Sequence, residues 1–252
     1  MEQEFKLTFD WHTHTTFSGN THAKGSIEEN VKAGIAAGLL SIGISNHGPG
    51  HVTYGARRKD LLFMRQEVDE LQSRYPQIKI LLGIEANIIN QSGHLDIKEE
   101  DLELLDYLMA GYHFGVFGEN PLEAGKVHGI NFLSGITHRT SPMNRLKNTE
   151  LIVRAVYENE IRVLTHPGAK GDIFLDEVAR ACASRNTLLE INNSGHGRLS
   201  ADDIREASKT DVKFVISSDA HHPSKVGHFG SALKRVLEAD LDPGRVVNLV
   251  RV

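Results

Sequence analysis

This 252-residue sequence has little of several features that mark particular classes of protein. It has one cysteine, Cys182, so an intramolecular disulfide is impossible and a zinc site built from several thiolates is excluded. It also has no run of 18 apolar residues, and its first residues lack the basic start and apolar stretch of a signal peptide. We therefore expect a soluble cytoplasmic protein without a membrane segment, in which nitrogen and oxygen atoms hold any metal.

An excess of positive charge is also missing. The chain has 28 Lys and Arg against 33 Asp and Glu, which gives a formal net charge of -5. Non-specific binding to nucleic acid needs an extended positive surface, so a nucleic-acid partner is disfavoured. The remaining composition, 40% hydrophobic and 24% charged, is that of an ordinary globular protein, and its unusual feature is 14 histidines.

Short apolar runs alternate with helical patterns along the chain. Seven runs predict buried parallel strands: Lys6 to Phe9, Leu40 to Ser45, Ile78 to Ile84, Tyr107 to Ala110, Ile161 to Thr165, Thr187 to Asn192 and Val212 to Ser217. Six segments between them predict helices: Ser26 to Ala37, which opens with the capping box Ser26-x-x-Glu29, Asp60 to Tyr75, Thr149 to Asn159, Leu175 to Ser184, Ala201 to Ser208 and Ser231 to Ala239. This alternation predicts an α/β fold built of βα units around a parallel sheet. No linker or repeat divides the chain, so we expect one domain over residues 1–252.

The segment from Val116 to Asn148 has no firm periodicity. It contains scattered Gly, His, Ser and Pro. Loops of this length are uncommon in compact domains and are often functional, so we interpret the segment as a lid or a substrate loop.

Histidines and carboxylates follow almost every predicted strand. In a barrel of parallel strands the active site lies at the carboxyl ends of the strands, where such side chains would meet. His12 and His14 are alternate residues of an extended segment, so both imidazoles can reach one cation. The other polar residues at strand ends are His47, Glu85, His113, His166, Asn192, Asn193, Asp219 and His221. Their joint placement predicts a metal cluster.

The segments that contain these residues resemble the PHP (polymerase and histidinol phosphatase) family, most closely its stand-alone bacterial phosphatases with three metals. The resemblance extends over nearly the whole chain. The matching segments are His12-Thr-His14-Thr, Asn20-Thr-His22-Ala, Asn46-His47-Gly-Pro, Gly83-Ile-Glu85-Ala-Asn-Ile, Gly111-Tyr-His113, His166-Pro-Gly, Leu189-Glu-Ile-Asn-Asn and Ser218-Asp219-Ala-His221. The resemblance implies a distorted (β/α)7 barrel of the TIM type. Two departures are Asn46, where the family commonly has Asp, and the segment from Val116 to Asn148, which looks longer than in those phosphatases.

The resemblance also implies nine ligands that are shared among three divalent cations. The implied division gives the first cation His12, His14, Glu85 and Asp219, the second Glu85 as a bridge with His113 and His166, and the third His22, His47 and His221. Glu85, Asp219 and His221 are the ligands that we expect to act in catalysis. Because nitrogen and oxygen ligands accept zinc, manganese and iron, the sequence leaves the metal open.

Grouped divalent cations suit the hydrolysis of phosphate esters. They bind phosphoryl oxygens, lower the pKa of a bridging water and neutralise charge on the leaving oxygen. We therefore predict a metal-dependent phosphoesterase that hydrolyses small phosphate monoesters by in-line attack of a metal-bridging hydroxide, with histidinol phosphate-like compounds as one candidate substrate class. Arginine binds phosphate through its bidentate fork and asparagine through its amide, and the residues predicted to contact substrate are Arg57, Arg58, Arg139, Asn192 and Arg198.

Other functions fit parts of the same pattern. An amidohydrolase-like metallohydrolase also has His-x-His after its first strand, but it often adds a carboxylated lysine, and no lysine here ends a predicted strand convincingly. A PHP-type nuclease could cut phosphodiesters with the same cluster, which the low positive charge weakens only modestly. A non-catalytic module is a further alternative, because the ligand set can be degraded in PHP-type domains attached to DNA polymerases, whereas all nine expected ligands are present here. The sequence gives no indication of the oligomeric state.

Overall fold

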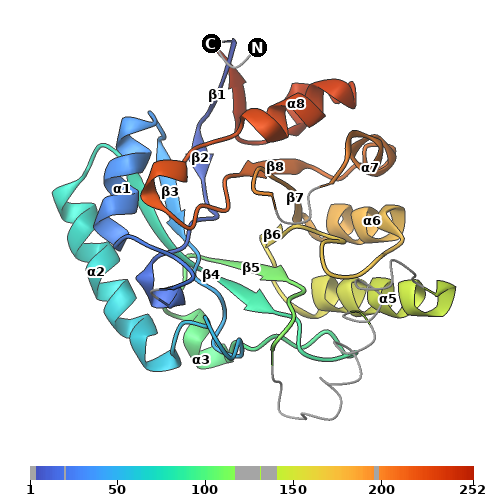
Figure 1. Ribbon diagram of the computed structural model, residues 1–252, viewed down its shortest axis with the longest axis horizontal. Helices are drawn as coiled ribbons and strands as arrows, with labels where there is room; N and C mark the ends of the chain where they lie inside the picture. The colour runs from blue at the N-terminus through green and yellow to red at the C-terminus, as the bar shows by residue number, and fades with distance from the viewer. Residues whose placement is uncertain (1–3, 20, 117–130, 132–140, 196–198) are drawn as a thin grey trace.

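Seven parallel strands form the centre of the protein (Figure 1). The computed structural model describes residues 4–19, 21–116, 131, 141–195 and 199–252. Within them the strands pair in chain order, and they are β2 (Phe9–Asp10), β3 (Ser41–Ile44), β4 (Lys79–Asn87), β5 (Tyr107–Gly111), β6 (Val163–Leu164), β7 (Leu188–Asn192) and β8 (Phe214–Ser217). Helices surround the strands, so the predicted α/β barrel is confirmed.

The sheet closes between its first and last strands. The N–H of His14 donates to the carbonyl of Ala220 at 2.8 Å, and the N–H of Ala220 donates to the carbonyl of His12 at 3.2 Å. The buried carboxylate of Asp10, on β2, also accepts a hydrogen bond from the N–H of Ser218 at 3.2 Å, just after β8. The backbone and one buried side chain therefore complete the distorted barrel.

Most of the helices lie where the sequence predicts them. They are α1 (Ile27–Ala36), α2 (Leu61–Arg74), α3 (Glu99–Leu102), α5 (Pro142–Glu158), α6 (Leu175–Arg185), α7 (Ala201–Ala207) and α8 (Gly230–Glu238). The predicted capping box of α1 is present, since the N–H of Glu29 donates to Ser26 Oγ at 3.2 Å and the N–H of Ser26 donates to Glu29 Oε2 at 2.7 Å. None of the helices in the described residues is long and apolar enough to cross a membrane.

The barrel interior changes from apolar to polar along its axis. Met109, Val163, Leu188 and Val215 come from four neighbouring strands and pack together inside. Side chains two residues apart on a strand face the same side, so Glu190 follows Leu188 into the interior. The apolar layer therefore supports a polar layer nearer the carboxyl ends of the strands.

The predicted first strand, Lys6 to Phe9, is in fact two strands in different sheets. β1 (Phe5–Leu7) pairs antiparallel with β9 (Leu249–Arg251), whereas β2 begins at Phe9 and enters the barrel. At Thr8, between them, the N–H donates to the carbonyl of Asn248 at 2.9 Å. The expectation of one strand is wrong because this residue redirects the chain.

Helix α5 begins seven residues before the predicted start at Thr149. Ser141 Oγ accepts the N–H of Asn144 at 3.1 Å, and Pro142 fits the first turn because it has no N–H to satisfy. Residues 142–148 are therefore helix and cannot belong to the predicted lid or substrate loop. Apart from Val116, Asn131 and Ser141, the rest of that segment lies outside the described residues.

Asn131 lies in a buried cluster of side-chain amides. Its Nδ2 donates to Tyr112 Oη at 2.9 Å and to Asn148 Oδ1 at 2.8 Å. Its Oδ1 accepts from the Nδ2 atoms of Asn144 and Asn148 at 2.8 and 2.9 Å. Asn131→Ala removes all four of these hydrogen bonds from a buried cluster, so we expect the free energy of unfolding to fall by about 2–4 kcal/mol. Urea denaturation measures the loss, and Gln77→Ala, at an exposed position, serves as the control with a change within about 0.5 kcal/mol. Equal stability of both variants would contradict the prediction.

Candidate metal centre

The structure brings together all nine side chains that the sequence pointed to as ligands. Eight follow or end barrel strands at the carboxyl end of the barrel, and His22 reaches them from the loop before α1. The eight come from every barrel strand except β7. They are His12 and His14 after β2, His47 after β3, Glu85 on β4, His113 after β5, His166 after β6, and Asp219 and His221 after β8. Residues far apart in the sequence therefore form one cluster.

Glu85 lies at the centre of the cluster. Its Oε2 lies 3.3 Å from His12 Nε2 and 2.9 Å from His47 Nδ1. Its Oε1 lies 2.8 Å from His166 Nε2 and 3.4 Å from His113 Nε2. The two oxygens of one carboxylate thus face different imidazoles, an arrangement that suits a bridge between two cations.

Asp219 presents one oxygen to the histidines and has the other held by polar neighbours. Its Oδ1 lies 3.3 Å from His14 Nε2 and 3.5 Å from His12 Nε2. Its Oδ2 accepts hydrogen bonds from Ser194 Oγ at 2.9 Å and from Asn192 Nδ2 at 3.1 Å. These contacts orient the carboxylate toward the histidines.

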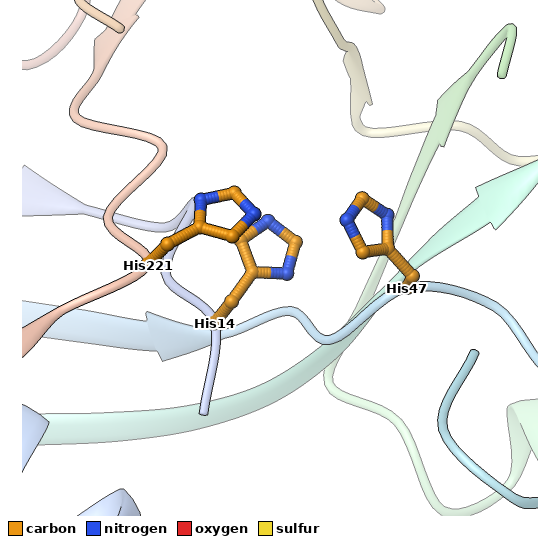
Figure 2. Close-up of side chains that lie close together, drawn as sticks. All are labelled: His14, His47 and His221. Carbon is orange, nitrogen blue, oxygen red and sulfur yellow. The ribbon is translucent and has the colours of Figure 1, made fainter. Parts of the chain in front are cut away.

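A third group consists of imidazoles alone. His22 Nε2 lies 3.1 Å from His47 Nε2 and 2.9 Å from His221 Nε2. Figure 2 shows that His47 and His221 also face a common space with His14, and one ring nitrogen of each lies within 4.8 Å of the others. The ring of Tyr54 stacks on His22 with centroids 3.8 Å apart, which fixes the orientation of this loop histidine.

Several atoms of the cluster are buried without a hydrogen-bond partner among the described residues. They are Nε2 of His12 and His14, together with Nδ1 of His47 and Oε2 of Glu85, which lie 2.9 Å apart without the geometry of a hydrogen bond. Each unpaired buried polar group costs about 1–3 kcal/mol unless something else binds it. Neutral imidazole nitrogens and carboxylate oxygens are ligands that zinc, manganese and iron accept, so the residues fit a metal centre.

Burial and charge set the protonation of these side chains. Burial lowers the pKa of His47 to about 3 and that of His22 to about 4, which leaves both lone pairs free for a cation at neutral pH. Burial would raise the pKa of Glu85, but His12 and the other imidazoles around it together outweigh burial and hold the pKa well below its usual value. Burial likewise lowers the pKa of His12, but Glu190 and Glu85 outweigh it and raise the pKa well above its usual value. A cation would compete with the proton on that imidazole.

Two residues of the cluster have strained backbone. His166 has a φ of 29° and Asp219 a φ of 53°, in the left-handed region that residues other than glycine rarely adopt. Such conformations cost about 1–3 kcal/mol each and gather at functional sites. The surrounding contacts, such as the 2.8 Å approach of His166 Nε2 to Glu85 Oε1, hold these side chains in place despite the strain.

Glu190 belongs to the site although the sequence did not lead us to it. Its Oε1 lies 2.6 Å from His12 Nδ1. Its Oε2 accepts hydrogen bonds from the N–H of His166 at 2.7 Å and from Asn192 Nδ2 at 3.0 Å. The available signal was a glutamate inside an apolar strand, because a buried carboxylate needs partners. Glu190 therefore orients two residues of the cluster from behind.

We expect Glu190→Gln to lower the affinity for zinc about 10–100-fold, because glutamine keeps the volume and loses the charge that orients His12. Competition with a chromophoric chelator measures this affinity. Glu177→Gln, at an exposed position on α6, is the matched control. An unchanged zinc affinity in Glu190→Gln would count against its orienting role.

Asn46 ties together the loops that carry the ligands. Its Oδ1 accepts the N–H of Thr15 at 2.8 Å and the hydroxyl of Ser18 at 2.9 Å. Ser18 Oγ in turn accepts the N–H of His47 at 3.1 Å. The amide oxygen supplies an acceptor that an aspartate would also supply, so the departure at this position preserves the contact.

A cavity of about 800 Å³ opens above the cluster, and two of the predicted substrate residues do not line it. Arg57 Nε donates to Asp60 Oδ2 at 2.6 Å, and its side chain is 71% exposed. Arg58 forms an ion pair with Asp101. Neighbouring carboxylates thus hold both arginines away from the position that we expected.

Of the remaining predicted substrate residues, Asn192 is described by the structure, and it does not line the cavity. Asn192 is buried beneath the cluster, where its amide contacts Glu190 and Asp219. Arg139 and Arg198 lie outside the described residues. Within the described part of the chain, the cationic side chains that line the cavity, besides histidines, are Lys24, Lys170 and Lys225.

Comparison with known proteins identifies the family. Residues 10–194 match the model of the PHP domain. A protein of Acetivibrio thermocellus named "Probable phosphatase" is 27% identical over 250 residues, which cover 96% of this chain and 91% of that protein. The "Probable phosphatase YcdX" of Escherichia coli O1:K1 / APEC is 28% identical over 251 residues, which cover 95% and 89%. In fold, the chain is similar to histidinol phosphate phosphatase from Lactococcus lactis, solved with zinc, L-histidinol and phosphate, with a TM-score of 0.61 and 17% identity over 93% of each chain. The chain belongs to the PHP domain family.

Proposed function

We propose that this protein is a metal-dependent phosphatase that hydrolyses monoesters of small phosphorylated compounds. The observation that carries the proposal is the position of Glu85, whose two oxygens face different imidazoles within 3.4 Å. The names of the curated relatives support a phosphatase, and the Lactococcus lactis structure supports zinc and phosphate as ligands of this fold.

The proposed ligands form three groups around Glu85. The first cation would be held by His12, His14, Glu85 and Asp219, the second by Glu85, His113 and His166, and the third by His22, His47 and His221. Cations bound there would polarise the phosphoryl group, activate water and neutralise charge on the leaving oxygen. Zinc, manganese and iron all suit these donors.

The chain itself fixes the ligands and shapes the space above them. Glu190 orients His12 and His166, and Ser194 and Asn192 hold the outer oxygen of Asp219. Pre-oriented donors need little rearrangement when charge develops on a reacting phosphate. This electrostatic preorganisation is usually the largest contribution to catalysis. The site residues with the most direct part in the reaction are proposed to be Glu85, Asp219 and His221.

The cavity favours a small substrate over nucleic acid. It encloses about 800 Å³, within the range of about 300–1,000 Å³ that is typical for sites of small molecules. A nuclease would need a groove with a positive surface along a polynucleotide backbone. A small phosphorylated substrate is therefore the partner that we propose.

Three assays on zinc- and manganese-loaded protein test the proposal. Release of p-nitrophenol from p-nitrophenyl phosphate should be at least about tenfold faster than from bis-p-nitrophenyl phosphate, a ratio that corresponds to about 1.4 kcal/mol. A cyclic amide should not be hydrolysed. A preference for the diester would point to a nuclease, and hydrolysis of the amide to an amidohydrolase.

The reaction should proceed without a covalent phosphoenzyme, because no residue is required as the nucleophile when water is activated in place. Rapid-quench measurement of phosphate release checks this. A trapped phosphorylated protein would contradict the proposed direct attack by water.

A further inference from the structure

Three lysines line the cavity above the proposed metal centre, and they come from three separate loops. Lys24 lies before α1, Lys170 after β6, and Lys225 after β8. Among the described residues, no carboxylate lies within ion-pair distance of these three ammonium groups. By contrast, Lys32 and Lys234 on the outer helices each approach a glutamate of their own helix, at 3.0 and 3.6 Å. The cavity lysines are therefore available to a ligand.

The rest of the lining strengthens this local positive charge. Within the described residues, the acidic side chains of the lining are Glu85 and Asp219, which are already proposed ligands. The formal net charge of the whole chain is -5, so a cationic cavity wall runs against the overall charge. Charges of one sign on the walls of a cavity focus the field and attract ligands of the opposite sign.

The scissile phosphate does not need the three lysines. Under the proposed function, cations at the floor of the cavity neutralise that phosphate. The lysines belong to the loops that line the cavity, and a space of about 800 Å³ holds a ligand much larger than phosphate. The lysines are thus positioned for another part of the ligand.

We propose that the substrate of this site carries a second anionic group, a phosphate or a carboxylate, which binds to Lys24, Lys170 and Lys225. This inference rests on the proposed function, and it makes the three lysines determinants of specificity that take no part in the bond-breaking step. Ammonium groups bind either anion as point charges with three donors. A substrate whose second group is cationic, such as the amino group of histidinol phosphate, would be repelled.

Phosphonates that resist hydrolysis test the binding of a second anion without any turnover. Isothermal titration calorimetry on zinc-loaded protein compares propylphosphonate, 2-carboxyethylphosphonate and propane-1,3-bisphosphonate, with the zinc content checked after each titration. We expect at least one of the two probes with a second anionic group to bind about tenfold or more tightly than propylphosphonate, because one charge-assisted hydrogen bond contributes about that much affinity. The probe that binds more tightly identifies the second group as carboxylate or phosphate. Equal affinity for all three probes would refute the inference.

Lysine variants connect this preference to the named residues. The triple variant Lys24→Ala, Lys170→Ala, Lys225→Ala should bind all three probes within about twofold of one another, because the ammonium groups that distinguish a second anion are gone. Lys234→Ala, on the outer surface, should keep the wild-type preference. A preference that survives in the triple variant would refute the role of these lysines.

Turnover separates this inference from the proposed function. Fructose 1,6-bisphosphate should have a lower KM than fructose 6-phosphate at similar kcat, and the difference should disappear in the triple variant. If p-nitrophenyl phosphate is hydrolysed but neither probes nor sugar phosphates show a preference, the second-anion site is wrong while the phosphatase stands. If no phosphate ester is hydrolysed and no phosphonate binds, the proposed function itself fails, and the inference fails with it.

Discussion

Replacing Glu85 with glutamine should reduce kcat/KM for p-nitrophenyl phosphate by about 10³-fold or more, which corresponds to about 4 kcal/mol of lost transition-state stabilisation. Glutamine has nearly the same shape, but it is neutral and its amide nitrogen cannot ligate a cation. Because the two oxygens of Glu85 face different imidazoles of the cluster, the change removes the ligand from one proposed cation site and leaves the other with a neutral amide oxygen in place of a carboxylate. Steady-state kinetics and elemental analysis measure the two losses together.

The control for this variant is Glu100→Gln, whose side chain is 71% exposed on α3. It should retain wild-type kinetics and metal content. A Glu85→Gln protein that keeps its full metal complement and more than about a tenth of the wild-type kcat/KM would contradict the bridging role. Such a loss corresponds to less than about 1.4 kcal/mol of transition-state stabilisation.

Removing the metals should abolish activity and lower the melting temperature by roughly 8–16 °C. Binding of a ligand at about 1,000 times its Kd stabilises a folded protein by about 4.1 kcal/mol, and each kcal/mol is worth about 2–4 °C in a chain of this size. The physical reason is that removal returns His12 Nε2, His14 Nε2, His47 Nδ1 and Glu85 Oε2 to the unpaired state. Differential scanning calorimetry before and after dialysis against a chelator measures the shift.

Adding zinc or manganese back should restore both the melting temperature and the activity, and calcium should not, since it prefers six to eight oxygen ligands. A magnesium-treated sample controls for ionic strength. If the melting temperature is the same with and without the chelator, the cluster holds no tightly bound cation and the proposed function loses its basis.

The strand ends explain why so much of the site could be predicted from the sequence. Parallel strands place their carboxyl ends together, so residues such as His47, Glu85 and His113 had to meet once their runs formed adjacent strands. His22 follows no strand, and only the family resemblance indicated it. Its place depends on a loop and on the ring of Tyr54, contacts that the hydrophobic pattern does not encode.

The parts that were not predicted depend on side chains that meet only after folding. Asp60 forms an ion pair with Arg57, and Asp101 forms one with Arg58. No local sequence pattern predicts such pairs. Lys170 lines the cavity because of the path of its loop. A loop has no regular spacing of apolar residues from which that path could be predicted. The start of α5 is different, because Ser141 and Pro142 are a recognisable helix start that apolar spacing alone does not reveal.

The antiparallel ribbon of β1 and β9 has a consequence for chain connectivity. It places the two ends of the described chain side by side, and the N–H of Val252 donates to the carbonyl of Glu4 at 2.9 Å (Figure 1). The ribbon leads into β2 at the amino end of the barrel, opposite the cavity. A short peptide could therefore join the two ends, and the chain could be opened instead at the exposed turn between Pro76 and Gln77. Such a circularly permuted protein should fold to the same barrel, with the cavity end of the barrel unchanged.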